Sequence, residues 1–229
     1  MRAITATLAL AATVLLVPAP GSAVPGETPI QPGAKIFSPV GQCTMNFVFT
    51  DPAGTLYIGT AGHCARVGDR VSSEEGSFGT AVYSHRTTVK DFALIRIDTD
   101  RYDQVDPAVR AWGGPTGHTT ATETTIGDPL LQYGFGIGFG EAAETRQRLG
   151  PMSNDSFTRY RAYVPSNFGD SGSPVLHAAT GKALGVVVEF AYATGLSEGP
   201  TVEAILADLA AEGYALAVVT APWEPFIPN

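Results

Sequence analysis

Residues 169–174 read GDSGSP, a serine between two glycines in a sequence typical of a tight turn. Glycine adopts backbone conformations that other residues avoid, so this turn can aim the N–H groups of Gly169 and Ser171 at one point. Two donors that converge in this way can bind a negatively charged oxygen. A single GDSG sequence can equally be an ordinary structural turn, so its interpretation depends on the rest of the chain.

Two stretches nearer the N-terminus carry the groups that a reactive serine needs. TAGHC at residues 60–64 ends an expected strand and places the imidazole of His63 where it can face a cleft. DFALI at residues 91–95 begins an apolar strand with a single carboxylate, Asp91, which can accept a hydrogen bond from an imidazole N–H. The sequence therefore offers a nucleophile, a base and a group that orients the base.

Other residues could compete for these roles. Asp98 and Asp100 are alternatives to Asp91, but they lie at the polar end of the same strand, where carboxylates are usually solvated. His85, His118 and His177 are interpreted as surface or core histidines, because no motif surrounds them.

The stretches TAGHC, DFALI and GDSGSP, in this order, resemble the three motifs of the chymotrypsin (trypsin-like) serine peptidase family. The 28 residues from His63 to Asp91 resemble the spacing of its short bacterial secreted members. The resemblance covers residues 36–212. It implies an all-β fold of two six-stranded antiparallel β-barrels with a C-terminal helix. It also implies a catalytic triad of His63, Asp91 and Ser171, with an oxyanion hole formed by the amides of Gly169 and Ser171.

The pattern of the whole chain favours the same fold class. Its 26 glycines and 17 prolines separate short runs rich in Val, Ile, Phe, Tyr and Thr, which is typical of an all-β barrel or sandwich. The strands are expected over residues 44–50, 56–60, 79–84, 92–97, 130–135, 158–164, 174–177, 183–190 and 214–220.

The chain is expected to divide into two halves. Residues 99–125 have the composition of a connection. We expect a first β-barrel over residues 36–110, which carries the histidine and the aspartate. Residues 111–229 are expected to hold a linker, a second barrel with the serine, the helix at about residues 201–212, and a tail.

The N-terminal segment predicts export. Arg2 precedes the apolar residues 3–17, and small residues complete a signal peptide over residues 1–23. No later stretch approaches the ~20 apolar residues of a transmembrane helix. Residues 24–35 are interpreted as a flexible lead or a short pro-segment. We therefore expect a secreted, extracellular monomer without a membrane anchor.

Cys43 and Cys64 are the only cysteines, and two cysteines in an exported protein predict one disulfide. They flank the hairpin expected over residues 44–60, and the family resemblance implies the same bridge beside the histidine. No Cys-x-x-Cys or His-Glu-x-x-His spacing occurs, so no metal site is expected. The proposed chemistry requires no cofactor.

The charge and the sequence around Ser171 restrict the substrate. A net charge of −8 with 14 scattered basic residues argues against a nucleic-acid partner and leaves a protein or peptide substrate. The family alignment places Pro165, Val188 and Phe190 in the specificity pocket. Because Pro165 stands where an acid would select Arg or Lys, a small or medium uncharged side chain is expected before the scissile bond.

Asp170 requires a cationic partner if it is buried. In the family this partner is a new N-terminal amine or an internal arginine. No sequence typical of such an N-terminus is present, and the junction Lys35-Ile36, only seven residues before Cys43, is a weak substitute. The internal candidates are Arg146, Arg148, Arg159 and Arg161.

The motifs together predict a serine endopeptidase that forms an acyl-enzyme on Ser171. The alternative is a peptidase-fold binding module with weak or no catalysis, in which Phe190 blocks the substrate. An esterase of another fold is disfavoured, because GDSGS lacks the Gly-x-Ser-x-Gly pattern.

Overall fold

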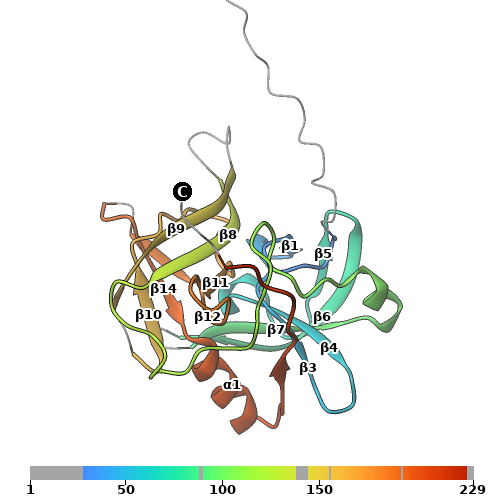
Figure 1. Ribbon diagram of the computed structural model, residues 1–229. Coiled ribbons are helices and arrows are strands. Elements are labelled where there is room, and N and C mark those ends of the chain that lie inside the picture. Colours follow the sequence, from blue (N-terminus) through green and yellow to red (C-terminus); the bar gives the residue numbers. More distant parts are fainter. Residues whose placement is uncertain (1–27, 88–89, 138–143, 155, 192, 226–229) are drawn as a thin grey trace, which may run out of the picture.

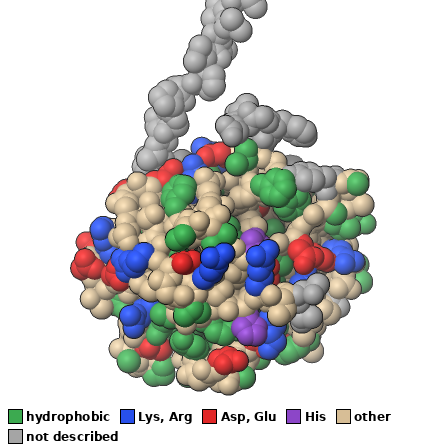
Figure 2. Space-filling view, turned by 180° about the vertical axis from the view of Figure 1, so that it is seen from behind, with side chains coloured by type: hydrophobic (Ala, Val, Ile, Leu, Met, Phe, Trp, Pro, Cys, Tyr) green, Lys and Arg blue, Asp and Glu red, His purple; other side chains and the backbone are tan. Residues whose placement is uncertain are grey.

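The structure is a computed structural model that describes residues 28–87, 90–137, 144–154, 156–191 and 193–225. The expected signal peptide lies outside these residues. The described chain forms two antiparallel sheets and one α-helix, and none of its helices is long and apolar enough to cross a membrane (Figure 1). Basic and acidic side chains are interspersed on the face shown in Figure 2.

The first sheet contains the two stretches that carry the histidine and the aspartate. Its eight strands follow the order β15-β3-β4-β7-β6-β5-β1-β2. They are β1 (Lys35–Ser38), β2 (Gly41–Thr44), β3 (Val48–Thr50), β4 (Leu56–Thr60), β5 (Arg70–Ser73), β6 (Gly76–Arg86), β7 (Asp91–Ile97) and β15 (Ala217–Val218). Since β15 pairs with β3, the end of the described chain returns to the first sheet.

The second sheet contains the strands around the serine turn. Its seven strands follow the order β12-β11-β8-β9-β10-β14-β13. They are β8 (Pro129–Ile137), β9 (Glu144–Asn154), β10 (Arg159–Ala162), β11 (Pro174–His177), β12 (Ala183–Val186), β13 (Glu189–Ala191) and β14 (Leu196–Pro200). A 3₁₀ helix at Thr99–Gln104 begins the connection between the sheets.

The prediction of an all-β fold with a C-terminal helix is confirmed, but the strand count differs from two sets of six. Residues 45–47 join β2 to β3, and their backbone continues the pairing: Met45 N–H donates to Ala34 O at 2.8 Å, and Asn46 N–H donates to Gly59 O at 2.8 Å. Residues 187–188 join β12 to β13 in the same way. If β2 and β3 are counted as one bent strand, the first sheet has six strands besides β15. If β12 and β13 are counted as one, the second sheet also has six. The strand pairings themselves close neither sheet into a barrel.

Residues 28–34 do not form the expected flexible lead. Ile30 is fully buried and Ala34 is 2% exposed. The backbone N–H of Gly33 donates to Met45 O at 2.8 Å. An apolar residue such as Ile30 gains free energy by leaving water, and this burial holds the segment against the first sheet.

The helix α1 (Val202–Ala211) begins one residue after the predicted start. The hydroxyl of Thr201 accepts a hydrogen bond from Ala204 N–H at 3.2 Å and so caps the first turn. Ile205 and Leu209, four residues apart, are buried in the main apolar core.

Candidate active site

His63 and Asp91 are in direct contact. The pairing of β4 with β7 brings the end of one strand beside the start of the other, and His63 follows β4 in a single 3₁₀ turn. Its Nδ1 lies 2.8 Å from Oδ2 of Asp91, and its backbone N–H donates to Oδ1 at 2.9 Å. When the carboxylate is ionised it only accepts, so this contact then requires Nδ1 to donate and leaves Nε2 as the acceptor. The imidazole is 25% exposed and can reach a substrate.

The turn that carries Ser171 is attached to both sheets. On the first-sheet side, Thr44 N–H donates to Ser171 O at 2.9 Å, and the Thr44 hydroxyl donates to Gly169 O at 2.8 Å. On the second-sheet side, Gly172 N–H donates to Val187 O at 2.7 Å. The serine therefore lies at the junction of the two sheets.

Two glycines of this turn cannot be replaced without strain. Gly169 and Gly172 have φ values of +98° and +94°, a region that side-chain-bearing residues rarely adopt. A Cβ on Gly172 would lie 2.1 Å from Thr44 O, and one on Gly169 would lie 2.7 Å from Phe135 O. The GDSGSP sequence thus combines an unusual backbone with close contact to the neighbouring strands.

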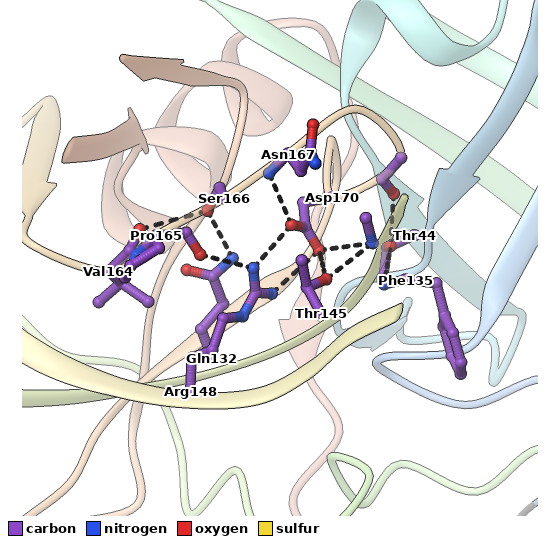
Figure 3. A network of polar contacts seen from close by, with 12 residues as sticks. Thr44, Gln132, Phe135, Thr145, Arg148, Val164, Pro165, Ser166, Asn167 and Asp170 are labelled. Carbon is purple, nitrogen blue, oxygen red and sulfur yellow. Dashed lines mark hydrogen bonds and ion pairs between the residues drawn. The ribbon is translucent and has the colours of Figure 1, made fainter. Parts of the chain in front are cut away.

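Asp170 is completely buried and is held by an ion pair with Arg148 (Figure 3). Nη1 of Arg148 donates to Oδ2 at 2.6 Å, and Nη2 donates to Oδ1 at 2.9 Å. The carboxylate also accepts from the Thr145 hydroxyl at 2.6 Å and from the backbone N–H groups of Gly136 and Asn167, both at 2.9 Å. Five donors and one full positive charge thus stabilise this buried anion.

Among the four arginines considered from the sequence, only Arg148 bonds to Asp170 in the structure. Arg146 pairs with Glu144, whereas Arg159 and Arg161 pair with glutamates of β13 and β14. The strand β9 pairs with β8, and this pairing sets Arg148 opposite Gln132. The register thus brings the Arg148 guanidinium beside the turn that carries Asp170.

Cys43 and Cys64 form a disulfide with Cα atoms 6.2 Å apart. The bridge connects β2 to the turn that holds His63, and Thr44, the residue after Cys43, holds the Ser171 carbonyl. The histidine and serine turns are therefore joined through one disulfide and one hydrogen bond. The two sulfurs lie near the imidazole, but as a disulfide they offer no thiolate to a metal.

Loss of this disulfide is expected to weaken both stability and turnover. It closes a loop with a sequence separation of 21 residues, so Cys43→Ser combined with Cys64→Ser should cost about 3 kcal/mol of unfolding free energy. Because the bridge anchors the histidine turn, kcat should fall more than substrate affinity. Denaturant unfolding and steady-state kinetics measure the two effects. Two titratable thiols in the native, fully active protein would contradict this expectation.

The three residues predicted for the specificity pocket lie in different environments. Val188 is 6% exposed, and its N–H donates to Glu198 O at 3.0 Å. Pro165 is exposed, and its carbonyl accepts from Arg148 at 2.7 Å. The ring of Phe190 packs edge to face on Phe168, with centroids 5.3 Å apart.

A cavity of about 180 Å³ lies along β13 and β14. Of the three predicted pocket residues, only Phe190 is among the residues that line it; they are Arg161, Glu189, Phe190, Ala191, Leu196 and Glu198. Glu189 and Glu198 were not predicted to line a pocket, because the family alignment places the selecting acid at the position of Pro165. The signal available in the sequence was Glu189, a charged residue inside the apolar run from Leu184 to Phe190.

Comparison with solved structures identifies the fold. The chain resembles a Nocardiopsis protease, with 21% identity, a TM-score of 0.61, and coverage of 82% of this chain and 98% of that one. It resembles Thermobifida fusca protease A, with 21% identity, a TM-score of 0.60, and coverage of 83% and 98%. A glutamic-acid-specific serine protease matches at 21% identity, with a TM-score of 0.59 and coverage of 83% and 100%.

The chain therefore has the two-sheet β fold of the bacterial chymotrypsin-like serine proteases, in agreement with the resemblance of its three motifs. No protein-family model matches the sequence, and no curated protein matches it.

Proposed function

We propose that this chain is a secreted serine endopeptidase with Ser171, His63 and Asp91 as its catalytic triad. The contact between Nδ1 of His63 and the Asp91 carboxylate carries the proposal, because it fixes the imidazole with Nε2 available as a base. The nearby Ser171 turn and the protease fold of the chain support it. The disulfide is consistent with an oxidising compartment after removal of a signal peptide.

The proposed reaction proceeds through an acyl-enzyme. The hydroxyl oxygen of Ser171 attacks the peptide carbonyl carbon while Nε2 of His63 takes its proton. The amides of Gly169 and Ser171 bind the resulting oxyanion. His63 then gives the proton to the leaving amine as the C–N bond breaks. A water molecule attacks the ester by the same steps and restores the serine. Asp91 stabilises the imidazolium throughout.

An extended peptide substrate can pair with β13. In the described chain β13 pairs only with β14 and forms one edge of the second sheet. Addition of a strand to such an edge is a common mode of peptide recognition. Asp170 is neutralised by Arg148, so the turn needs no newly formed N-terminal amine to become ordered.

A fluorophosphonate probe tests the proposal directly, because it phosphonylates only a serine activated by a base. We expect the full-length protein to be labelled on Ser171 and the Ser171→Ala variant to remain unlabelled. Ser72→Ala, on β5, is the matched control and should label normally. Absence of labelling in the folded wild-type protein would favour a binding module instead of an enzyme.

A further inference from the structure

Apart from Phe190, the side chains that line the cavity along β13 and β14 belong to one face of the second sheet, here called the outer face. Side chains alternate between the two faces of a strand, so Glu189 lies opposite Phe190 across β13. Glu189 pairs in register with Glu198, which pairs with Arg161 on β10, and these side chains share one face. Ser197, the partner of Phe190, is fully buried and marks the inner face.

The charges on this outer face are unequally compensated. Nε of Arg161 donates to Glu198 at 2.7 Å, and Nη2 lies 2.7 Å from the same oxygen. Arg159 reaches Glu198 at 3.4 Å and Glu189 at 3.5 Å. Glu198 is thus bound by two guanidinium groups, whereas Glu189, with its side chain 47% exposed, has only the longer contact to Arg159 among the ion pairs of the described residues. The four side chains together carry no net charge, but the less compensated negative charge lies at Glu189.

The two glutamates also repel each other. The pKa of Glu189 is raised by partial desolvation, then by the hydrogen bond that it shares with Glu198, with Asp91 adding a further negative charge. Burial would raise the pKa of Glu198, but Arg161, Glu189 and Arg159 together lower it. A ligand cation would relieve the same repulsion.

Backbone hydrogen bonds and one ring contact connect the segment of β13 to the turn that carries the proposed nucleophile. Val187, two residues before Glu189, accepts from Gly172 N–H, and Val187 N–H donates to Ser173 O at 3.0 Å. Phe190 contacts Phe168, which lies three residues before Ser171. A peptide paired with the edge of β13 would place alternate side chains on the inner face, at Val188 and Phe190, and on the outer face, at Glu189.

We propose that Glu189 and Glu198 form a subsite for a basic side chain of the substrate, Lys or Arg, at the second or fourth residue before the scissile bond. The two positions are counted from the scissile bond, so they rest on the proposed peptidase function. The substrate residue directly before the scissile bond would lie on the inner face with Val188 and Phe190. The second and fourth residues before the bond would then lie over the cavity. The stems of Lys and Arg would pack on Ala191 and Leu196, which also line it.

Binding to a full-length Ser171→Ala protein tests the subsite whether or not the wild-type protein cleaves peptides. The probes are two fluorescent six-residue peptides with alanine at alternate positions and either Lys or Gln between them. If the bound peptide shifts by two residues along β13, its lysines remain on the same face of the sheet. We expect the Lys peptide to bind about tenfold more tightly at low salt, with the difference reduced at high salt. Adding Glu189→Gln should bring the ratio close to one.

Two further variants distinguish recognition from a general loss of fold. Arg161→Gln removes a competitor for Glu198 and should increase the preference for the Lys peptide, opposite to Glu189→Gln. Glu75→Gln, an equal change of charge on the turn between β5 and β6, should leave the ratio unchanged. Equal affinity for the two peptides, or a preference that survives Glu189→Gln, would overturn the subsite. A lysine preference in a protein that no fluorophosphonate labels would refute the peptidase function and retain the subsite.

Discussion

Replacement of Ser171 by alanine is expected to lower kcat on the order of 10⁶-fold, because the acyl-enzyme cannot form without the hydroxyl. His63→Ala should cost a similar factor, since the serine then has no base. The double variant should be little worse than either single variant, because the two residues act as one unit. Asp91→Asn should cost about 10⁴-fold, because an amide that donates to Nδ1 stabilises the wrong tautomer of His63.

Steady-state hydrolysis of a peptide library measures these effects. Circular dichroism and the denaturant midpoint must show that each variant remains folded. His85→Ala is the matched control, since His85 lies on β6 and stacks on Tyr83 instead of contacting Asp91. Losses that add in the double variant, or an active Ser171→Ala protein, would assign the hydrolysis to other residues.

The local parts of the candidate site could be predicted because each is encoded in one short stretch. GDSGSP requires positive φ at both glycines, and the structure has it. The cysteines flank a hairpin and form the disulfide. Apolar alternation also located most strands. The strand count differs from the six per half that the resemblance implies, because residues 45–47 and 187–188 keep their backbone pairing between two separate strands.

The remaining parts depend on residues that are distant in sequence. Four arginines were candidates for Asp170, and only the register of β8 with β9 places Arg148 beside it. The face shared by Glu189 and Glu198 depends on the pairing of β13 with β14. Ile30 was expected to lie in a flexible lead or pro-segment, yet it is fully buried in the main apolar core. A single sequence carries little information about such pairings.

The ion pair between Arg148 and Asp170 provides the second large expected effect. Arg148→Met should lower the free energy of unfolding by about 3–5 kcal/mol, because it leaves a fully buried carboxylate without a counter-charge. Thr145, Gly136 and Asn167 still donate to it, but three neutral donors do not replace a cation. Turnover should fall as well, since Asp170 holds the turn whose amides would bind the oxyanion.

Arg146→Met is the matched control for this experiment. Arg146 lies two residues away on β9, but its side chain is 50% exposed and its ion pair with Glu144 is at the surface. Such pairs contribute at most about 1 kcal/mol, so this variant should unfold close to the wild type. Urea unfolding at neutral pH compares the stability of the two variants. The rate of peptide hydrolysis reports whether the turn that carries Ser171 keeps its conformation.

A double variant separates the charge from the shape of the site. Arg148→Met combined with Asp170→Asn removes the buried carboxylate together with its partner, so part of the lost stability should return. Turnover should remain low, because an asparagine cannot accept all of the hydrogen bonds that order residues 167–171. If Arg148→Met unfolds at the same urea concentration as Arg146→Met, the Arg148 guanidinium does not neutralise Asp170, and the proposed ordering of the turn without a new N-terminus fails.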